Sequence, residues 1–103
     1  MVVELLRFTI PAPMREEFIA CDARIWNDAL SSHSGFVSKE LWADLHDLTQ
    51  VVITVHWETY EQWKSFPLDL NAALNAQMCH LYTSVTCEEY ELRGEPVPAR
   101  SRV

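Results

Sequence analysis

The chain has 103 residues, of which 49% are hydrophobic and 22% are charged, and this fits one globular domain. Its 15 acidic residues outnumber 8 lysines and arginines and give a formal net charge of −7 at pH 7. That charge opposes binding to phosphate backbones and anionic lipid, so we expect no nucleic-acid partner and no membrane partner. No apolar run approaches the roughly 20 residues that cross a bilayer, and no basic leader opens the chain, so we expect a cytoplasmic protein.

The first half of the chain predicts a strand, a helix and a second strand. Residues 2–10 alternate with branched and aromatic side chains, and Pro11 and Pro13 end the strand. Pro13 also suits the first turn of a helix, which Ser31 to Gly35 would end. Residues 36–42 form the second strand. An apolar stripe at three-and-four spacing supports the helix, and consists of Met14, Phe18, Cys21, Ile25 and Ala29.

The second half predicts a hairpin, a broken helix and a final strand. Residues 43–48 are polar and would turn the chain into a strand that ends at Trp57. Thr59 and Gln62 have the spacing of a capping box, so a short helix should begin near Tyr60. Pro67 interrupts it. The helical stripe then resumes in Leu70, Leu74, Met78 and Leu81, the last strand covers 82–92, and residues 94–103 form an extended or disordered tail after a domain of residues 1–93.

This order of elements is β-α-β-β-α-β and predicts a ferredoxin-like α+β fold. Right-handed crossovers would place the helices on one face of an antiparallel sheet. Trp57 and its alternating neighbours would lie on one side of the third strand, with Val52, Thr54 and His56 on the other. The central strands are therefore apolar on both faces. Because the helices cover only one face, we expect a second copy of the chain to cover the other in a homodimer.

Three cysteines lack the spacing of a disulfide framework or a zinc site. Cys21, Cys79 and Cys87 include no Cys-x-x-Cys pair. A metal cluster of Cys79, His80 and Cys87 would lack a fourth ligand. We expect buried, reduced thiols and no bound metal.

Several of these segments resemble the antibiotic-biosynthesis-monooxygenase superfamily. The resemblance covers Met1 to about Leu92 and is carried by VVELLRFTIP, Gly35-Phe36 and VITVHWETYEQW, with Trp57 at a strand-end position typical of the superfamily. It implies a dimeric α+β barrel of two ferredoxin-like protomers. The segments around Trp42 and Trp63 are similar to a narrower, largely cyanobacterial group of uncharacterised proteins.

The haem-degrading branch of the superfamily combines an asparagine on the first strand, a tryptophan in the second helical region and a histidine ligand. Trp63 matches the tryptophan, whereas the other two positions hold Leu6 and Leu74. Without an imidazole at position 74, axial haem ligation by the family route is lost. The sequence thus predicts no cofactor.

Candidate site residues are aromatic or ionisable side chains within the predicted elements. Tryptophans can be core packing or can wall a pocket for a planar ligand, and Trp63 is the first choice for such a wall. His56 can be a hydrogen-bonded interface residue or a catalytic proton acceptor. Arg7 and Glu40 can form ion pairs or orient a ligand. The ligand-binding candidates are Trp63, Trp57, Trp26, Trp42, Arg7 and Glu40.

Two functions remain from the sequence. One is a cofactor-independent monooxygenase that acts on a small aromatic or polyketide-like compound, with His56 as the base. The other is a non-catalytic dimeric protein that binds a small molecule or is associated with stress. A cavity lined by His56 or Trp63 would favour the enzyme, and a filled interior would favour the second function.

Overall fold

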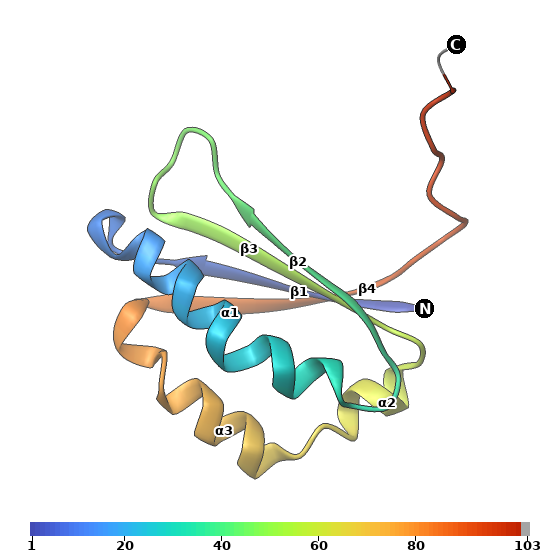
Figure 1. Cartoon of the computed structure of the whole chain (residues 1–103), viewed down its shortest axis with the longest axis horizontal. Helices are drawn as coiled ribbons and strands as arrows, with labels where there is room; N and C mark the ends of the chain where they lie inside the picture. Colours follow the sequence, from blue (N-terminus) through green and yellow to red (C-terminus); the bar gives the residue numbers. More distant parts are fainter. Residues whose placement is uncertain (102–103) are drawn as a thin grey trace.

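The computed structural model describes residues 1–101 and consists of one sheet with a layer of helices (Figure 1). The order of strands and helices along the chain is the one that the sequence predicts. Two short 3-10 turns, η1 and η2, precede α1 and follow α3. The elements are β1 (Val2–Thr9), η1 (Ala12–Met14), α1 (Arg15–Ser31), β2 (Phe36–Ala43), β3 (Gln50–Trp57), α2 (Tyr60–Lys64), α3 (Leu68–Ala76), η2 (Cys79–Leu81) and β4 (Ser84–Glu91).

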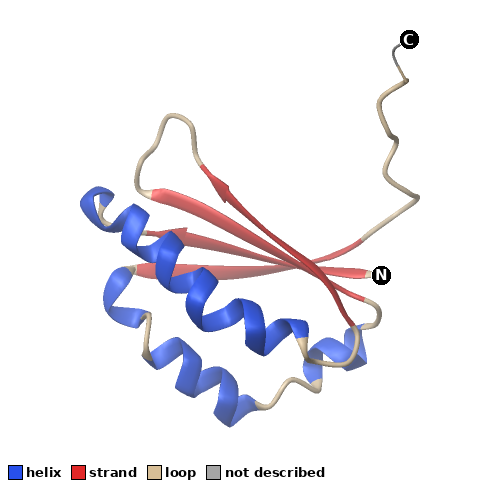
Figure 2. Ribbon diagram, viewed as in Figure 1, coloured by secondary structure: helices blue, strands red, loops and turns tan. Residues whose placement is uncertain are grey.

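The four strands form an antiparallel sheet in the order β2-β3-β1-β4. All the helices lie on one face of this sheet, and the other face is open (Figure 2). Each helical crossover passes one intervening strand, so that β1 runs parallel to β2 and β3 runs parallel to β4. The predicted ferredoxin-like α+β fold is confirmed.

Strand register decides which side chains face the helices. Glu4 pairs with Val55 of β3 and with Glu89 of β4, and Val2 pairs with Trp57. Alternation along the strands places this row on the helix-covered face. The next pair, Val3 with His56, lies on the open face. The predicted separation of His56 from the Trp57 row is confirmed.

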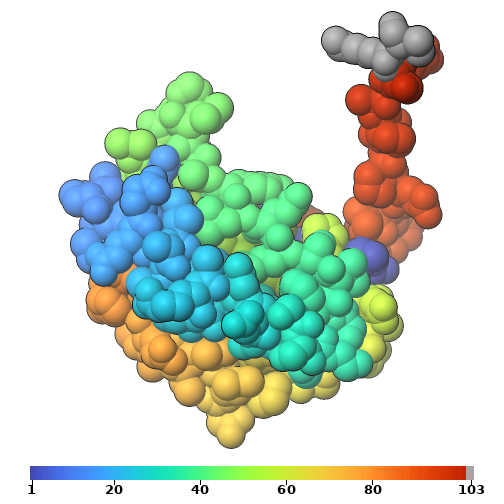
Figure 3. All heavy atoms as spheres, in the orientation of Figure 1, coloured from blue at the N-terminus to red at the C-terminus, as the bar shows by residue number. Residues whose placement is uncertain are grey.

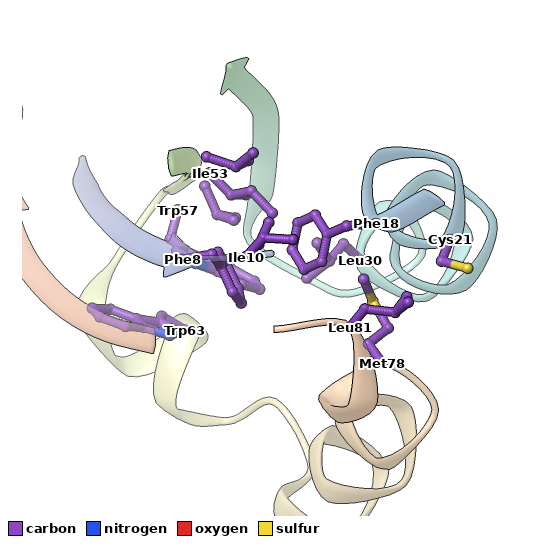
Figure 4. Close-up of a cluster of buried hydrophobic side chains, with 12 residues drawn as sticks. Phe8, Ile10, Phe18, Cys21, Leu30, Ile53, Trp57, Trp63, Met78 and Leu81 are labelled. Atoms are coloured by element: carbon purple, nitrogen blue, oxygen red, sulfur yellow. The ribbon is translucent and has the colours of Figure 1, made fainter. Parts of the chain in front are cut away.

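The hydrophobic core lies between the sheet and the helices, and α1 supplies most of its helical side chains (Figure 4). Phe18 is fully buried and packs against Phe8, with ring centroids 4.8 Å apart. Met78 and Leu81 also belong to the core, and both lie after the end of α3, Met78 in the connection to η2 and Leu81 at the end of η2. The sheet side of the core consists of Phe8, Val51, Ile53, Val55 and Trp57 on the strands and Ile10 directly after β1, and burying them removes apolar surface from water.

α3 differs from α1 because none of its residues is buried. Of the stripe predicted to face the core, Leu74 is half-buried and Leu70 is 40% exposed. Only Met78 and Leu81, beyond the end of α3, are buried as expected. α3 therefore covers the sheet, but its side chains do not fill the space between the helix and the sheet.

The start of α2 is fixed by the predicted cap and by a close approach of the loop before β2. The Gln62 backbone N–H donates to Thr59 Oγ1 at 3.2 Å, which confirms the cap, although the Gln62 side chain contacts the Thr59 hydroxyl and not its backbone. Gly35 has a φ of +87°, and a Cβ there would meet the Cβ of Gln62 at 2.5 Å. A glycine is needed at this position on both counts.

The expectation of three buried thiols is wrong for two of them. Cys21 is buried, but Cys79 and Cys87 are exposed. Cys87 belongs to β4, which is an edge strand of the sheet.

The C-terminal segment extends away from the domain. Residues 92–101 carry neither helix nor strand and run away from the body of the protein (Figure 3). Residues 102–103 of the predicted tail lie outside the described part of the chain.

Candidate functional site

A cavity of about 410 Å³ lies between the sheet and the helices, on the side covered by α3. This volume falls in the range of roughly 300–1,000 Å³ that small-molecule sites occupy. The sheet contributes Leu6, Ile53 and Val55 to its wall, and α3 contributes Leu68 and Asn71. The cavity follows from the packing, because a helix that buries no side chain leaves the sheet beneath it uncovered.

Three of the four tryptophans line this cavity. Trp57 comes from the end of β3, Trp63 from α2 and Trp26 from α1. Trp57 is 1% exposed and Trp63 is 8% exposed, so both rings are held in place by the surrounding core. Trp26 packs against Phe66 with ring centroids 6.2 Å apart. Such walls suit a planar aromatic ligand, and the predicted role of Trp63 as a wall is consistent with its position.

Lys64 places a positive charge at the Trp63 end of the cavity. Its Nζ lies 4.0 Å from the Trp63 ring centroid and 5.2 Å from that of Tyr60, within the range of cation–π attraction. The same Nζ lies 3.8 Å from Glu89 Oε2 on β4. The ammonium group therefore bridges α2 and the edge of the sheet beside the cavity.

Glu4 is an acidic side chain that contacts one of these aromatic walls, and the sequence analysis did not name it. Trp57 Nε1–H donates to Glu4 Oε1 at 3.2 Å, and both residues line the cavity. Burial raises the pKa of the Glu4 carboxyl, against the opposing effects of the Trp57 hydrogen bond and the Lys64 charge. The signal was available, since Glu4 interrupts the apolar row of Leu6, Phe8 and Ile10 on the first strand.

A buried ion pair forms the opposite wall, between α1 and β2. Lys39 Nζ donates to Asp22 Oδ2, and also to Asn27 Oδ1 at 2.7 Å. The side chains of Lys39 and Asp22 are 11% and 5% exposed. Burial raises the pKa of Asp22, while the hydrogen bond from Lys39 opposes this shift. Because its charge is compensated, Asp22 is poorly placed to act as a base.

The remaining predicted site residues lie on the open face of the sheet, away from the cavity. His56 has no partner for its buried Nδ1 within residues 1–101, and it does not line the cavity. Its role as a base stays a prediction. Arg7 Nε donates to Glu88 Oε1 at 2.5 Å. Glu40 shares that face, and Trp42, on the same face, is 51% exposed. The structure therefore brings together Trp26, Trp57 and Trp63, but not the other four.

Two kinds of feature, a metal-binding cluster and a membrane-spanning helix, are absent from the described residues 1–101. They contain no group of three or more His, Cys, Asp or Glu side chains that could hold a metal ion. No helix among them is long and apolar enough to cross a membrane.

Comparison with known proteins identifies the fold through solved structures. No family model and no curated protein sequence matches the chain. The cofactor-independent oxygenase SnoaB from Streptomyces nogalater is 18% identical, with 91% of this chain and 94% of that chain covered and a TM-score of 0.77.

Two further structures show the same arrangement. A monooxygenase from the gene ActVA-Orf6 of Streptomyces coelicolor, in complex with nanaomycin D, is 16% identical over 95% of this chain and 92% of that chain, with a TM-score of 0.82. A Deinococcus radiodurans protein assigned to the antibiotic biosynthesis monooxygenases is 20% identical over 98% and 100% of the two chains, with a TM-score of 0.75. The chain thus has the fold of these monooxygenases.

Proposed function

We propose that this protein is a cofactor-independent monooxygenase that oxidises a small aromatic or polyketide-like compound in the cavity beneath α3. The observation that carries the proposal is the cavity itself, which is lined by Trp26, Trp57 and Trp63 and also by ionisable side chains. The fold similarity to a cofactor-independent oxygenase and to a nanaomycin D complex supports it as analogy.

The reaction is one that a protein can promote with side chains alone. An acidic CH₂ group beside a carbonyl and an aromatic ring loses a proton to a base, and the resulting carbanion donates its electrons to oxygen. Return of the proton gives a hydroperoxide, which loses water to leave a ketone. The balance is R₂CH₂ + O₂ → R₂CO + H₂O, so the substrate supplies all the electrons. The protein supplies a base, orientation and a dry site.

Ligand binding followed by oxygen uptake tests this function. A panel of fused-ring phenols and ketones should quench tryptophan fluorescence, and Trp63→Phe should reduce that quenching. Trp42→Phe is the matched control, because Trp42 lies on the open face and its loss should leave the quenching in place. Compounds that bind should then increase oxygen uptake above the rate in buffer. Binding without oxygen uptake would favour the non-catalytic alternative, and no binding would contradict both functions.

We also propose that the protein works as a homodimer joined through the open face of the sheet. Val3, Leu5 and Val52 make the centre of that face apolar, and Thr54 Oγ1 and His56 Nδ1 are buried without hydrogen-bond partners in the described residues. A second copy could cover the apolar centre and pair these polar atoms. Sedimentation of a monomer at micromolar concentration would contradict this assembly, and Val52→Glu should dissociate a dimer.

A further inference from the structure

Glu4 places an ionisable group where the surrounding packing favours an uncharged one. It is half-buried, lies in a row between Val2 and Leu6, and faces the cavity. A glutamine would satisfy the Trp57 Nε1–H equally well, without the cost of a partly desolvated negative charge. What a carboxyl group adds at this position is the ability to take up and release a proton.

We propose that Glu4 is the proton acceptor of the cavity, and that it removes the acidic proton of a bound aromatic ketone to generate the anion that reacts with oxygen. This inference rests on the proposed function and names a catalytic residue for it. Glu4 Oε1 accepts the Trp57 hydrogen bond at 3.2 Å, so the carboxyl group has a defined orientation beside the Trp57 ring. Orientation of this kind is a requirement of general base catalysis.

The groups around Glu4 support a carboxylate that is both ionised and basic. Burial raises its pKa, which makes the carboxylate a stronger base than one in water, and Glu89 of β4 acts in the same direction. The Trp57 N–H and the Lys64 ammonium act in the opposite direction and keep ionisation accessible. Cys87 of β4 also lines this part of the cavity, and burial and the Glu4 charge raise the pKa of its thiol.

Lys64 has a second consequence for the proton transfer. Before the transfer the negative charge is on Glu4, and after it the charge is on the bound substrate in the same cavity. The Lys64 ammonium lies over the Trp63 ring at 4.0 Å from its centroid and can compensate the charge in both states. The proton transfer therefore moves one negative charge from Glu4 to the substrate near the same Lys64 ammonium, and the number of charges in the cavity does not change.

The proton balance closes without any further reactant. The Glu4 carboxylate takes a proton from the CH₂ group, and this gives the neutral acid and the substrate carbanion. The carbanion adds O₂ and becomes a peroxide anion, to which Glu4 returns the proton. The carboxylate is thereby regenerated, and loss of water from the hydroperoxide leaves the ketone. One group serves as acceptor and then as donor.

Anaerobic spectroscopy isolates the proton transfer from the oxygen reaction. The probe is 1,8-dihydroxyanthrone, whose acidic CH₂ lies between two rings and whose anion absorbs at longer wavelength than the neutral form. We expect wild-type protein without oxygen to develop the anion band when it binds the probe, with binding followed by tryptophan fluorescence. Glu4→Gln should bind the probe but lose the band.

Matched variants make the result specific to Glu4. Glu91→Gln removes an exposed carboxylate at the end of β4, outside the cavity, and should retain the band. His56→Ala tests the competing base on the open face. A band that persists in Glu4→Gln, or one that disappears only in His56→Ala, would overturn the inference, as would a wild-type protein that binds the probe with no anion band. Circular dichroism checks that each variant folds.

The same probe under air separates this inference from the proposed function. We expect Glu4→Gln to lower protein-dependent oxygen uptake by about 100-fold or more, the usual contribution of a general base. An anion band that depends on Glu4, without oxygen uptake by wild type, would refute the monooxygenase and still support Glu4 as the proton acceptor. Failure of the probe to bind would contradict the aromatic cavity, and with it both proposals.

Discussion

α1 and α3 occupy equivalent places in the two halves of the fold, yet they cover the sheet in different ways. α1 buries Phe18, Cys21, Asp22 and Leu30, whereas α3 buries none of its residues. Both helices lie in one layer over the same face (Figure 1). The difference shows that one half of the helix layer closes the core while the other forms the outer wall of a cavity.

This division has an energetic consequence. Core side chains beneath α1 provide most of the apolar burial, so that half should open only when the whole domain unfolds. α3 has few buried contacts and can open locally at a lower free energy. Ligand entry beneath α3 is therefore compatible with a stable core. Four experiments test this comparison, in order of decreasing expected effect.

Phe18→Ala should give the largest loss of stability. Its ring is fully buried and packs against Phe8, so the deletion leaves a void in the core and should lower the free energy of unfolding by about 3–5 kcal/mol. Leu68→Ala on α3 is the control, because Leu68 is 83% exposed and should change stability by less than about 0.5 kcal/mol. Urea unfolding measures both. Similar losses would show that α3 contributes to the core as α1 does.

Lys39→Met should come next, because it leaves Asp22 buried without its cation. We expect a loss of about 3 kcal/mol at pH 7. Burial already raises the pKa of Asp22, and the loss should decrease as the pH falls and the carboxyl is protonated. Lys64→Met is the control. The Lys64–Glu89 pair is about half exposed on both sides, so its removal should cost less than about 1 kcal/mol. Equal effects would contradict the contrast between the two walls.

Hydrogen exchange should distinguish the helices directly. We expect the backbone amides of α3 to exchange at least about 100-fold faster than those in the middle of α1, because α3 can open without unfolding the core. A bound aromatic ligand should slow exchange in α3 and leave α1 unchanged. Equal protection of the two helices without ligand would refute local opening of α3.

Glu4→Gln should have the smallest effect on stability and the opposite sign. Because the pKa of Glu4 is raised in the folded protein, the folded state binds its proton more tightly, and Glu4 lowers stability as the pH rises through that pKa. The variant should be slightly more stable than wild type at pH 7, and the difference should vanish at acidic pH, where both side chains are neutral. Glu91→Gln should show no such dependence. A variant less stable at pH 7 would contradict burial as the dominant influence on Glu4.

Most of the fold could be predicted from the sequence because strands and caps leave local patterns. The alternation in β3 placed Trp57 and His56 on opposite faces, and Thr59 marked the start of α2. The position of α3 relative to the sheet could not be predicted. A stripe such as Leu70 to Leu81 shows which side of a helix faces inward, but not how far the helix lies from the sheet.

The candidate site was predicted only in part for the same reason. Trp63, Trp57 and Trp26 were named, and they line the cavity. His56, Arg7, Glu40 and Trp42 lie on the open face, where only an oligomer could form a site around them. Glu4 was overlooked, although the sequence shows it as a single charge within an apolar row of the first strand. Its hydrogen-bond partner Trp57 could not be predicted, because that contact depends on how β1 pairs with β3.

Gly35 links sequence variation at a distant loop to the shape of the cavity. A side chain of any size there would push against Gln62, one residue before Trp63, so α2 would shift and the aromatic wall would move with it. A substitution at this position would thus change the shape of the cavity without altering any residue that lines it.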